Sequence, residues 1–206
     1  MLLTETVPVG SLGTNCYILR DENADSCVLI DPGEDAAFLL EKTRSMGLTV
    51  SGILLTHGHF DHVLAVAPLV KETGCPVWLH EEDHHPKAAT MANFFYPLSV
   101  DKQCQICHVN EGDVLSLAGL HIQVLATPGH TCGSVCYLCE DSLFAGDTLF
   151  AGSIGRTDLP GGSYSTIQAS LARLAALEKN YTIYPGHGES SDLATEKRSN
   201  PYLRGM

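Results

Sequence analysis

Three histidines and one aspartate fall within the seven residues 56–62, which read THGHFDH. The cluster directly follows the apolar stretch 53–55, which predicts a buried strand. The whole chain of 206 residues has only 10 histidines, so chance is a poor explanation for such a run. Imidazole and carboxylate groups at this density are typical of a metal site. We therefore expect a fold that places a metal-binding loop at the end of this strand.

The spacing within the cluster predicts two metal positions rather than one. His57 and His59 are two residues apart, so in an extended loop their side chains project to the same side and reach one ion. Gly58 leaves room for the backbone to approach that ion. Asp61 and His62 then begin a helix and point toward a second ion. These ligand types suit two divalent ions, for which we predict zinc, with iron or manganese as alternatives.

Three further candidate ligands each follow a predicted strand: His130 after residues 121–126, Asp147 after residues 142–145, and His187 after residues 182–184. Loops at strand ends are the usual place for a binding site, because the strands supply a rigid scaffold. Together with the first cluster they make seven ligands, too many for one tetrahedral ion but suited to two ions that share a carboxylate. Asp147 is the natural bridge between them.

Strands and helices alternate along the chain without repeats or low-complexity linkers. Strands are predicted at residues 16–19, 26–30, 53–55, 77–79, 121–126, 134–139, 142–145 and 182–184, the first two as a hairpin. Helices are predicted at residues 36–46, 63–72, 81–92, 163–179 and 193–198. Hairpins and helices are mixed rather than ordered as a strict strand–helix–strand series. This pattern favours an α+β sandwich of two sheets covered by helices.

Length and charge limit the partners of such a chain. A chain of 206 residues with 44% hydrophobic content is expected to bury a proper core as one domain, 1–206. A net charge of −12 with only 12 lysines and arginines argues against binding nucleic acid. The N-terminus lacks the pattern of a secretion signal, and no apolar run reaches membrane-spanning length. We expect a cytoplasmic enzyme for a small molecule, a monomer or homodimer without membrane or nucleic-acid partners.

Two Cys-x-x-Cys pairs raise the alternative of a four-thiolate zinc knuckle. Cys136 and Cys139, however, fall on a predicted strand and would point to opposite faces. Neither this pair nor Cys104 and Cys107 has the glycine that a tight knuckle turn needs. In a reducing compartment we expect buried or half-buried thiols instead.

The run of residues 80–85, HEEDHH, is as rich in potential ligands as the first cluster. It starts a predicted helix, where the helix dipole favours acidic side chains. We expect it to be a solvated helix end near the surface with no part in metal binding.

The stretches THGHFDH, TPGHT, AGDTLF and YPGHG occur in this order, with NCY near the N-terminus and IDPG before the first predicted helix. Together they resemble the metallo-β-lactamase superfamily and, within it, the short single-domain bacterial hydrolases of the glyoxalase II type. The resemblance covers nearly the whole chain, from Cys16 to His187. It implies a four-layer αββα sandwich.

The resemblance also implies a division of the ligands between the two ions. It implies that His57, His59 and His130 bind the first ion. It implies that Asp61, His62 and His187 bind the second ion and that the carboxylate of Asp147 bridges the two. Two-metal chemistry adds a catalytic role for Asp61, which orients the nucleophilic water. Asp31 of IDPG either supports these ligands from behind or caps the loop that follows it.

The implied activity is hydrolysis of small acyl thioesters, with S-lactoylglutathione giving lactate and glutathione as the leading reaction. Only a short tail follows His187, so we do not expect the helical extension that binds glutathione in larger members. β-Lactamases of the superfamily are exported and commonly use a cysteine ligand, where this chain has Asp147. The alternative is a mononuclear iron persulfide dioxygenase that oxidises glutathione persulfide. Such enzymes contain a related GRTD segment, and one would need only His57, His130 and Asp147 as ligands of its iron.

Arg156 and Tyr164 are the predicted substrate contacts. Arg156, in the GRTD segment after Asp147, either binds a substrate carboxylate through its planar fork or pairs with Asp158 to stiffen the loop. Tyr164 and the aromatic run Phe94, Phe95 and Tyr96 either line a pocket or pack as ordinary apolar side chains.

Overall fold

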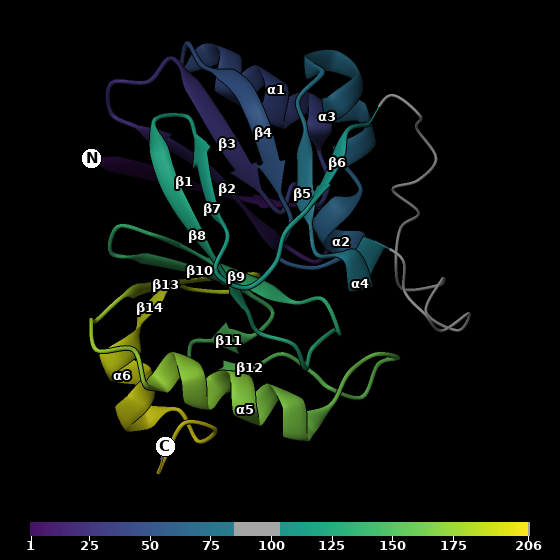
Figure 1. Cartoon of the computed structure of the whole chain (residues 1–206). Coiled ribbons are helices and arrows are strands. Elements are labelled where there is room, and N and C mark those ends of the chain that lie inside the picture. The colour runs from purple at the N-terminus through teal and green to yellow at the C-terminus, as the bar shows by residue number, and fades with distance from the viewer. Residues whose placement is uncertain (85–103, 206) are drawn as a thin grey trace.

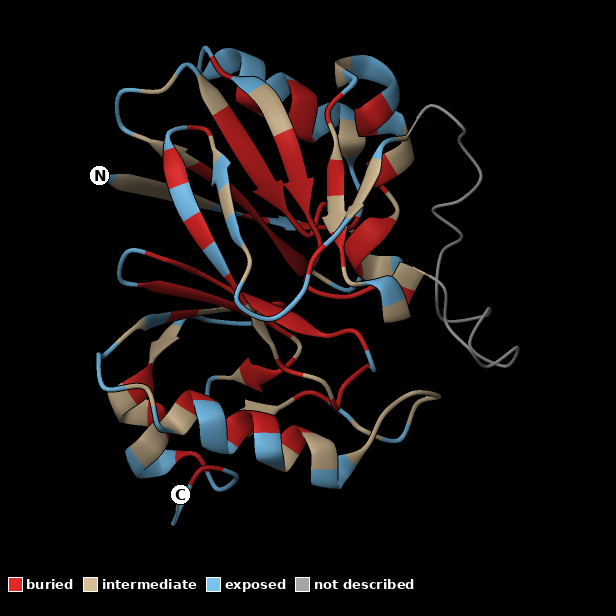
Figure 2. Ribbon diagram, viewed as in Figure 1, coloured by how far each residue is buried: buried red, intermediate tan, exposed pale blue. Residues whose placement is uncertain are grey.

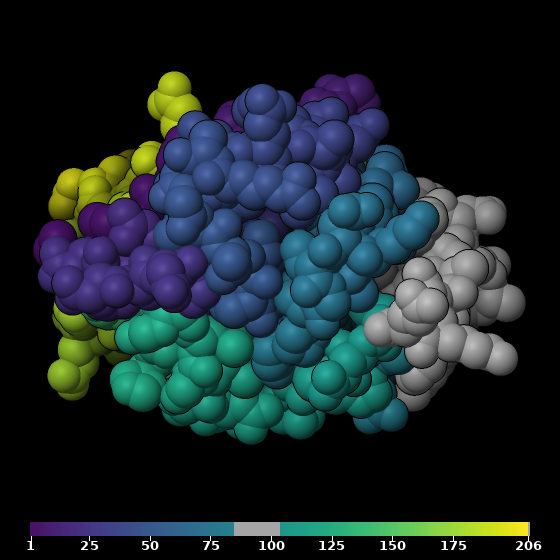
Figure 3. All heavy atoms as spheres, turned by 90° about the horizontal axis from the view of Figure 1, so that it is seen from above, coloured from purple at the N-terminus to yellow at the C-terminus, as the bar shows by residue number. Residues whose placement is uncertain are grey.

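Two six-stranded sheets pack face to face, and helices cover the outer face of each sheet (Figure 1). The structure is a computed structural model that describes residues 1–84 and 104–205. Seen from above, residues 36–73, which contain the helices that cover the first sheet, form one continuous outer surface (Figure 3). The order of layers is helix, sheet, sheet, helix, which confirms the predicted four-layer αββα sandwich.

The first sheet is mixed. Its strands follow chain order: β1 (Leu2–Val9), β2 (Thr14–Asp21), β3 (Ser26–Ile30), β4 (Thr49–Leu54), β5 (Val77–Leu79) and β6 (Ile106–His108). The first three strands are antiparallel, which confirms the predicted hairpin of β2 and β3, and the last four run parallel. Helices α1 (Ala36–Ser45) and α3 (Val66–Thr73) connect the parallel strands. Parallel strands bring their carboxyl ends to one edge of the sheet.

The second sheet is also mixed. Its strand order is β14 (Ser191–Asp192), β13 (Thr182–Pro185), β10 (Ser142–Gly146), β9 (Val135–Cys139), β8 (Leu120–Ala126) and β7 (Val114–Leu117). The central strands β10 and β13 are parallel, and helix α5 (Tyr164–Ala175) lies between them in the chain. A two-stranded ribbon of β11 (Leu149–Phe150) and β12 (Ser153–Ile154) and helix α6 (Leu193–Ser199) complete the described structure.

Strand alternation divides the core into three apolar layers. On β2, Cys16 and Ile18 face the layer under α1 and α3, while Tyr17 and Leu19 face the second sheet. Both faces of this strand are therefore buried, which explains its continuous apolar sequence. The third layer lies between the second sheet and the helices α5 and α6. Figure 2 shows α5 buried on the side that faces the sheet and exposed on the other.

The helix predicted over residues 63–72 is divided in two, which corrects the prediction. Helix α2 (Phe60–Val63) is a short turn, and α3 begins at Val66. One continuous helix would place Pro68 in its interior, where the ring clashes with the preceding turn and cannot donate a hydrogen bond. Beginning α3 at Val66 keeps Pro68 in the first turn, where a missing N–H costs little.

The helix predicted over residues 81–92 begins as expected with α4 (Glu81–His84). Residues 85–103 lie outside the described residues, and so do the aromatic residues Phe94, Phe95 and Tyr96. Within the described residues, no helix combines the length and the apolar character that crossing a bilayer requires.

The cysteine pairs do not form a zinc knuckle. Cys136 faces the outer helices, whereas Cys139 lies between the sheets, as the strand pattern predicts. Cys107 belongs to β6 in the other sheet. All eight cysteines fall within the described residues, none forms a disulfide, and no cluster of potential metal ligands there includes a cysteine.

Candidate metal centre

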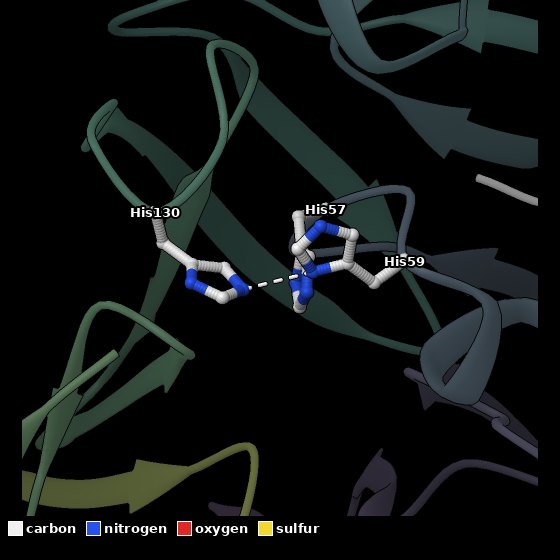
Figure 4. Close-up of side chains that lie close together, drawn as sticks. All are labelled: His57, His59 and His130. Carbon is white, nitrogen blue, oxygen red and sulfur yellow. Dashed lines mark hydrogen bonds between the residues drawn. The ribbon is translucent and has the colours of Figure 1, made fainter. Parts of the chain in front are cut away.

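The seven predicted ligands lie together where strand ends of both sheets meet. Two groups of predicted ligands have donor atoms that all lie within 4.8 Å of one another: His57, His59 and His130; and Asp61, His62 and His187. A third group of this kind joins Asp31 to His57 and His62. Four of the seven residues belong to the loop after β4 and to α2, and the other three follow β8, β10 and β13. Figure 4 shows His130 pointing from a loop of the second sheet toward His57 and His59 of the first.

The histidine cluster is buried and close enough for one ion. His59 Nδ1 lies 2.9 Å from His130 Nε2 (Figure 4). The ring centroid of His57 is 4.7 Å from that of His59 and 4.8 Å from that of His130. Donor atoms about 2.0–2.1 Å from a tetrahedral zinc lie about 3.3 Å apart, which is the scale of this cluster. The three rings can therefore bind one ion together.

The second cluster is more open. Asp61 Oδ2 lies 3.2 Å from His187 Nε2 and 3.5 Å from His62 Nε2. His62 is fully buried, whereas the His187 side chain is 28% exposed. Thr14 Oγ1 donates a 3.2 Å hydrogen bond to the same oxygen of Asp61. The exposed side of the centre is thus beside His187 and Asp61, and a substrate can approach from there.

Asp147 lies between the two clusters. Its Oδ2 is 3.5 Å from His130 Nε2, while its Oδ1 is 3.5 Å from His62 Nε2 and 3.8 Å from His187 Nε2. Each oxygen of the carboxylate faces a different cluster. This is the placement that a bridging ligand requires.

Unpartnered polar atoms at the centre test whether these residues fit metal ions. In the part of the chain that the structure describes, His57 Nε2, His62 Nε2 and Asp147 Oδ1 are buried and have no hydrogen-bond partner. Such atoms destabilise a folded protein unless something satisfies them. A divalent cation accepts lone pairs from all three, so the donor set fits metal ions.

Asp31 fixes the orientation of two of the histidines. Its Oδ2 lies 3.0 Å from His62 Nδ1 and accepts a 2.6 Å hydrogen bond from Thr56 Oγ1. Because that hydroxyl donates to Asp31, its oxygen is free to accept from His57 Nδ1 at 3.1 Å. Both rings therefore turn Nε2 toward the centre. Of the two interpretations of Asp31, the contacts favour the one in which it supports the ligands.

His130 is oriented by backbone rather than by a side chain. Its Nδ1 lies 2.8 Å from the carbonyl oxygen of Arg156, so Nε2 faces the centre.

The side chain of Arg156, a predicted substrate contact, pairs with Asp158 through two hydrogen bonds of 2.7 and 2.8 Å, and the two side chains are 61% and 69% exposed. The hydrogen bond from Arg156 lowers the pKa of Asp158 to about 2. Tyr164 is 56% exposed at the start of α5, so a substrate contact stays a prediction for both residues.

Burial and neighbouring charges shift the pKa values of the histidines in opposite directions. It lowers the pKa of His57 well below its ordinary value and that of His59 to about 3, with the neighbouring histidines adding to the effect. Burial also lowers the pKa of His62, but the carboxylates of Asp147 and Asp31 outweigh it and raise the value to about 9. His57 and His59 are thus neutral imidazoles, the form that binds metals, while the carboxylates around His62 favour a positive charge there.

Two glycines let the backbone pack directly against the ligands. A Cβ atom on Gly186 would lie 2.2 Å from Asp147 Oδ1 and 2.9 Å from His62 Cε1. A Cβ atom on Gly155 would lie 1.8 Å from the Asp147 carbonyl oxygen and 3.0 Å from His130 Nδ1. Gly186 belongs to YPGHG and Gly155 to GRTD, so the motifs mark both positions, but the close packing becomes visible only in three dimensions.

The N-terminal NCY motif positions His187, a role that the sequence alone did not reveal. Asn15 Nδ2 donates to the carbonyl oxygens of Pro185 and Gly188 at 3.0 and 2.9 Å. Tyr17 Oη donates to the same Pro185 oxygen at 2.5 Å. The first sheet therefore holds the loop that carries the last ligand of the second sheet.

The run of residues 80–85 requires a correction. Among the described residues it contributes to no cluster of potential metal ligands, as expected. Asp83, however, is 3% exposed rather than solvated. Backbone N–H groups of two nearby loops need an acceptor at that position, and Asp83 supplies it. His85 lies outside the described residues.

Comparison with known proteins places these features in a family. Residues 9–187, which include all seven candidate ligands, match the metallo-beta-lactamase superfamily. The hydroxyacylglutathione hydrolase GloC of Haemophilus influenzae is 35% identical over 206 residues, covering 97% of each chain. The structure of TTHA1623 in a di-iron-bound form matches with a TM-score of 0.81 and 38% identity, over 97% of this chain and all of that one. The structure of the B3 metallo-beta-lactamase BLEG-1 matches with a TM-score of 0.84 and 32% identity, over 98% of this chain and all of that one.

Proposed function

The chain belongs to the metallo-beta-lactamase superfamily, and we propose that it is a metal-dependent hydrolase of small acyl thioesters, of the hydroxyacylglutathione hydrolase type. The observation that carries this proposal is the position of Asp147, with one oxygen toward each of two clusters of potential ligands. A centre of this form suits hydrolysis by two ions.

The proposed ligand set divides the seven residues as the clusters do. The first ion is assigned to His57, His59 and His130, and the second ion to Asp61, His62 and His187. Asp147 is assigned as the bridge between the two ions. We propose zinc at both positions, with iron or manganese as alternatives, and the di-iron form of TTHA1623 supports a two-ion arrangement. When bound, such ions activate a water and stabilise the negative charge that develops on a carbonyl oxygen.

Asp61 is the group of the chain that we propose to orient the attacking water. Burial raises the pKa of Asp61, but the hydrogen bond from His187 and the charge of His62 outweigh it and hold the value below its ordinary range. The carboxylate is therefore ionised at neutral pH and accepts a hydrogen bond from water. Thr14 Oγ1 and His187 Nε2 fix its Oδ2. A thiolate is a good leaving group, so a thioester needs no strong general acid from the chain.

The relatives support the substrate class to different degrees. GloC matches almost end to end, which supports a hydroxyacylglutathione such as S-lactoylglutathione. BLEG-1 matches equally completely and is described as a B3 metallo-beta-lactamase, so a β-lactam belongs among the substrates tested. The exposed apolar side chains of Leu12 and Phe60 line a shallow pocket together with Asp61, and they offer a surface to the acyl or thiol part of a substrate.

One experiment separates these activities. The purified protein is analysed for metal and assayed in parallel with S-lactoylglutathione, with a cephalosporin, and with glutathione persulfide by oxygen consumption. We expect two ions per chain and release of glutathione and lactate. One iron per chain with oxygen consumption and no hydrolysis would overturn the proposal in favour of a persulfide dioxygenase, and cephalosporin turnover without thioester turnover would overturn its substrate class.

Removal of the metals is expected to lower the melting temperature. Without them the buried atoms at the centre lose their partners and the carboxylates around His62 repel one another. Each ion at 1,000 times its Kd contributes about 4 kcal/mol, so two ions contribute about 8 kcal/mol. A chain of this size loses about 2–4 °C per kcal/mol, so a fall on the order of 20 °C is expected. Calorimetry before and after chelation measures it, with re-addition of zinc as the control. An unchanged melting temperature after complete removal contradicts the assigned centre.

The variant Asp61→Ala is expected to lower kcat on the order of 10²-fold, because the attacking water loses the group that orients it. The histidine cluster is untouched, so the first ion should stay bound. Glu178→Ala is the control, since this exposed carboxylate follows α5 and belongs neither to the pocket nor to either cluster. Steady-state kinetics with metal analysis measures the effect. Unchanged turnover with both ions bound would show that another group orients the water.

A further inference from the structure

Asp83 is a buried carboxylate that the proposed chemistry does not use. It lies on α4, just after β5, and is 3% exposed. Its Oδ2 accepts hydrogen bonds from the Gly58 N–H at 2.9 Å and from Thr131 Oγ1 at 2.7 Å. Its Oδ1 accepts one from the Gly133 N–H at 2.8 Å. All three bonds are buried, so the two backbone N–H groups would lose their partner without Asp83.

The three donors belong to the two loops that carry the first histidine cluster. Gly58 stands between His57 and His59, and Thr131 directly follows His130. The first loop extends from the first sheet and the second loop from the second sheet. One carboxylate therefore connects the two halves of the sandwich beside the ligands.

The contact leaves no room for another arrangement. A Cβ atom on Gly133 would lie 2.7 Å from Asp83 Oδ1, so the backbone of the second loop packs directly against the carboxylate. Ser134 Oγ lies 2.7 Å from Thr131 Oγ1 and accepts the Thr131 N–H at 3.0 Å, which holds the turn that presents both donors. The loop cannot shift toward or away from Asp83 without breaking these bonds.

We propose that Asp83 is a positioning residue that holds the His57–His59 loop and the His130 loop together, so that three imidazoles converge on one ion. The inference rests on the proposed function for the identity of that ion's ligands. It is specific to the first cluster, because Asp31 orients His62 and the residues Thr14 and Asn15 hold Asp61 and the His187 loop. Loss of Asp83 should therefore weaken binding of the first ion and spare the second.

The variant Asp83→Asn is the sharpest test because it keeps the size of the side chain. An amide has one acceptor oxygen, so its NH₂ group must face either the N–H of Gly133 or the donors from Gly58 and Thr131. Thr131→Val removes one of the three bonds and should give a smaller effect, while Thr131→Ser keeps the hydroxyl and should restore binding. These two variants preserve the test if Asp83→Asn does not fold.

Glu196→Gln is the matched control. Glu196 is 2% exposed, and its carboxylate also accepts three hydrogen bonds, from the Gly152 N–H, Asn200 Nδ2 and Ser191 Oγ. None of these donors belongs to a loop that carries the histidine cluster. Two of the three bonds are only partly buried, and Ser191 Oγ can accept from the new amide group. The control therefore neutralises a buried carboxylate away from the first ion at a smaller cost in stability than Asp83→Asn.

The measurement is titration of the metal-free full chain with Co²⁺, followed by visible absorption with a competing chelator. The variant His59→Ala identifies the absorption phase of the first ion. For Asp83→Asn we expect the affinity of that phase to fall about 10–100-fold, while the second phase and both phases of Glu196→Gln stay within about threefold.

Two results would overturn the inference, and they are distinguishable. If Asp83→Asn lowers the stability of the chain but binds Co²⁺ as well as Glu196→Gln does in both phases, Asp83 has only a structural role and the proposed function stands. If the unaltered chain binds no Co²⁺ through His59, the proposed function fails and the inference fails with it.

Discussion

Replacing Asp147 by alanine is expected to lower thioester hydrolysis on the order of 10³-fold and to weaken metal binding in both clusters at once. The carboxylate places Oδ2 toward His130 and Oδ1 toward His62 and His187, so a single truncation removes a ligand from each ion. Metal ions supply several kcal/mol of transition-state stabilisation to such a reaction, and each 1.4 kcal/mol is about tenfold in rate.

Asp141→Ala is the control for this variant. Asp141 precedes β10, at the opposite end from Asp147, and its exposed side chain forms an ion pair with Lys179. An exposed pair contributes at most about 1 kcal/mol, so the control should keep both its metals and its turnover. Metal content per chain and kcat/KM with S-lactoylglutathione are measured for both variants. If Asp147→Ala keeps two ions per chain and turns over within about threefold of the unaltered protein, the bridging assignment is wrong.

The convergence of the seven candidate ligands could be predicted because each follows an apolar strand, and the carboxyl ends of strands that run in the same direction lie at one edge of a sheet. The rule needs no knowledge of which strands pair. It located His130 and His187, which come from different loops of the second sheet, on local pattern alone. The division of residues 57–62 between an extended loop and a helix was likewise readable from two-residue spacing, and the structure begins α2 at Phe60.

The groups that hold the ligands could not be predicted, because their partners are distant in sequence and have no motif of their own. Asn15 bonds to Gly188 across 173 positions, and Asp83 bonds to Gly133 across 50. In sequence, Asp83 is one acidic residue among several at a helix start, where the dipole alone explains acidic side chains. Only the three-dimensional arrangement shows that two loops need an acceptor there.

Several strands were missed for a related reason. On β7 exposed and half-buried residues alternate without a fully buried position, so its apolar residues give a weak signal. On β1 the first four residues are only half-buried, and β6 has three residues. These strands lie at the edges of the sheets, where pairing with one neighbour rather than burial stabilises them. None of the three carries a candidate ligand, so the centre could be located without them.

The variant Gly186→Ala is expected to disable the centre without removing any ligand. Its Cβ atom would lie 2.2 Å from Asp147 Oδ1, a distance at which one of the two must move. The carbonyl of Gly186 accepts from the Asn15 N–H and its own N–H donates to Gly146, so the backbone is held on both sides and the carboxylate must give way. We expect a loss of activity on the order of 10²-fold or more, comparable to displacement of a ligand by about 1 Å.

Gly188→Ala separates this effect from general strain in the same loop. Gly188 has a φ of +78°, and no atom lies within 4 Å of the position that a Cβ atom would take, so alanine there costs roughly 1–2 kcal/mol of backbone strain without touching Asp147. Both variants should melt at lower temperature, but only Gly186→Ala should lose metal and turnover. Melting curves, metal analysis and kcat/KM for the pair decide the matter. If the two variants lose activity in proportion to their loss of stability, close packing against Asp147 is not what Gly186 provides, and the loop matters only for the fold.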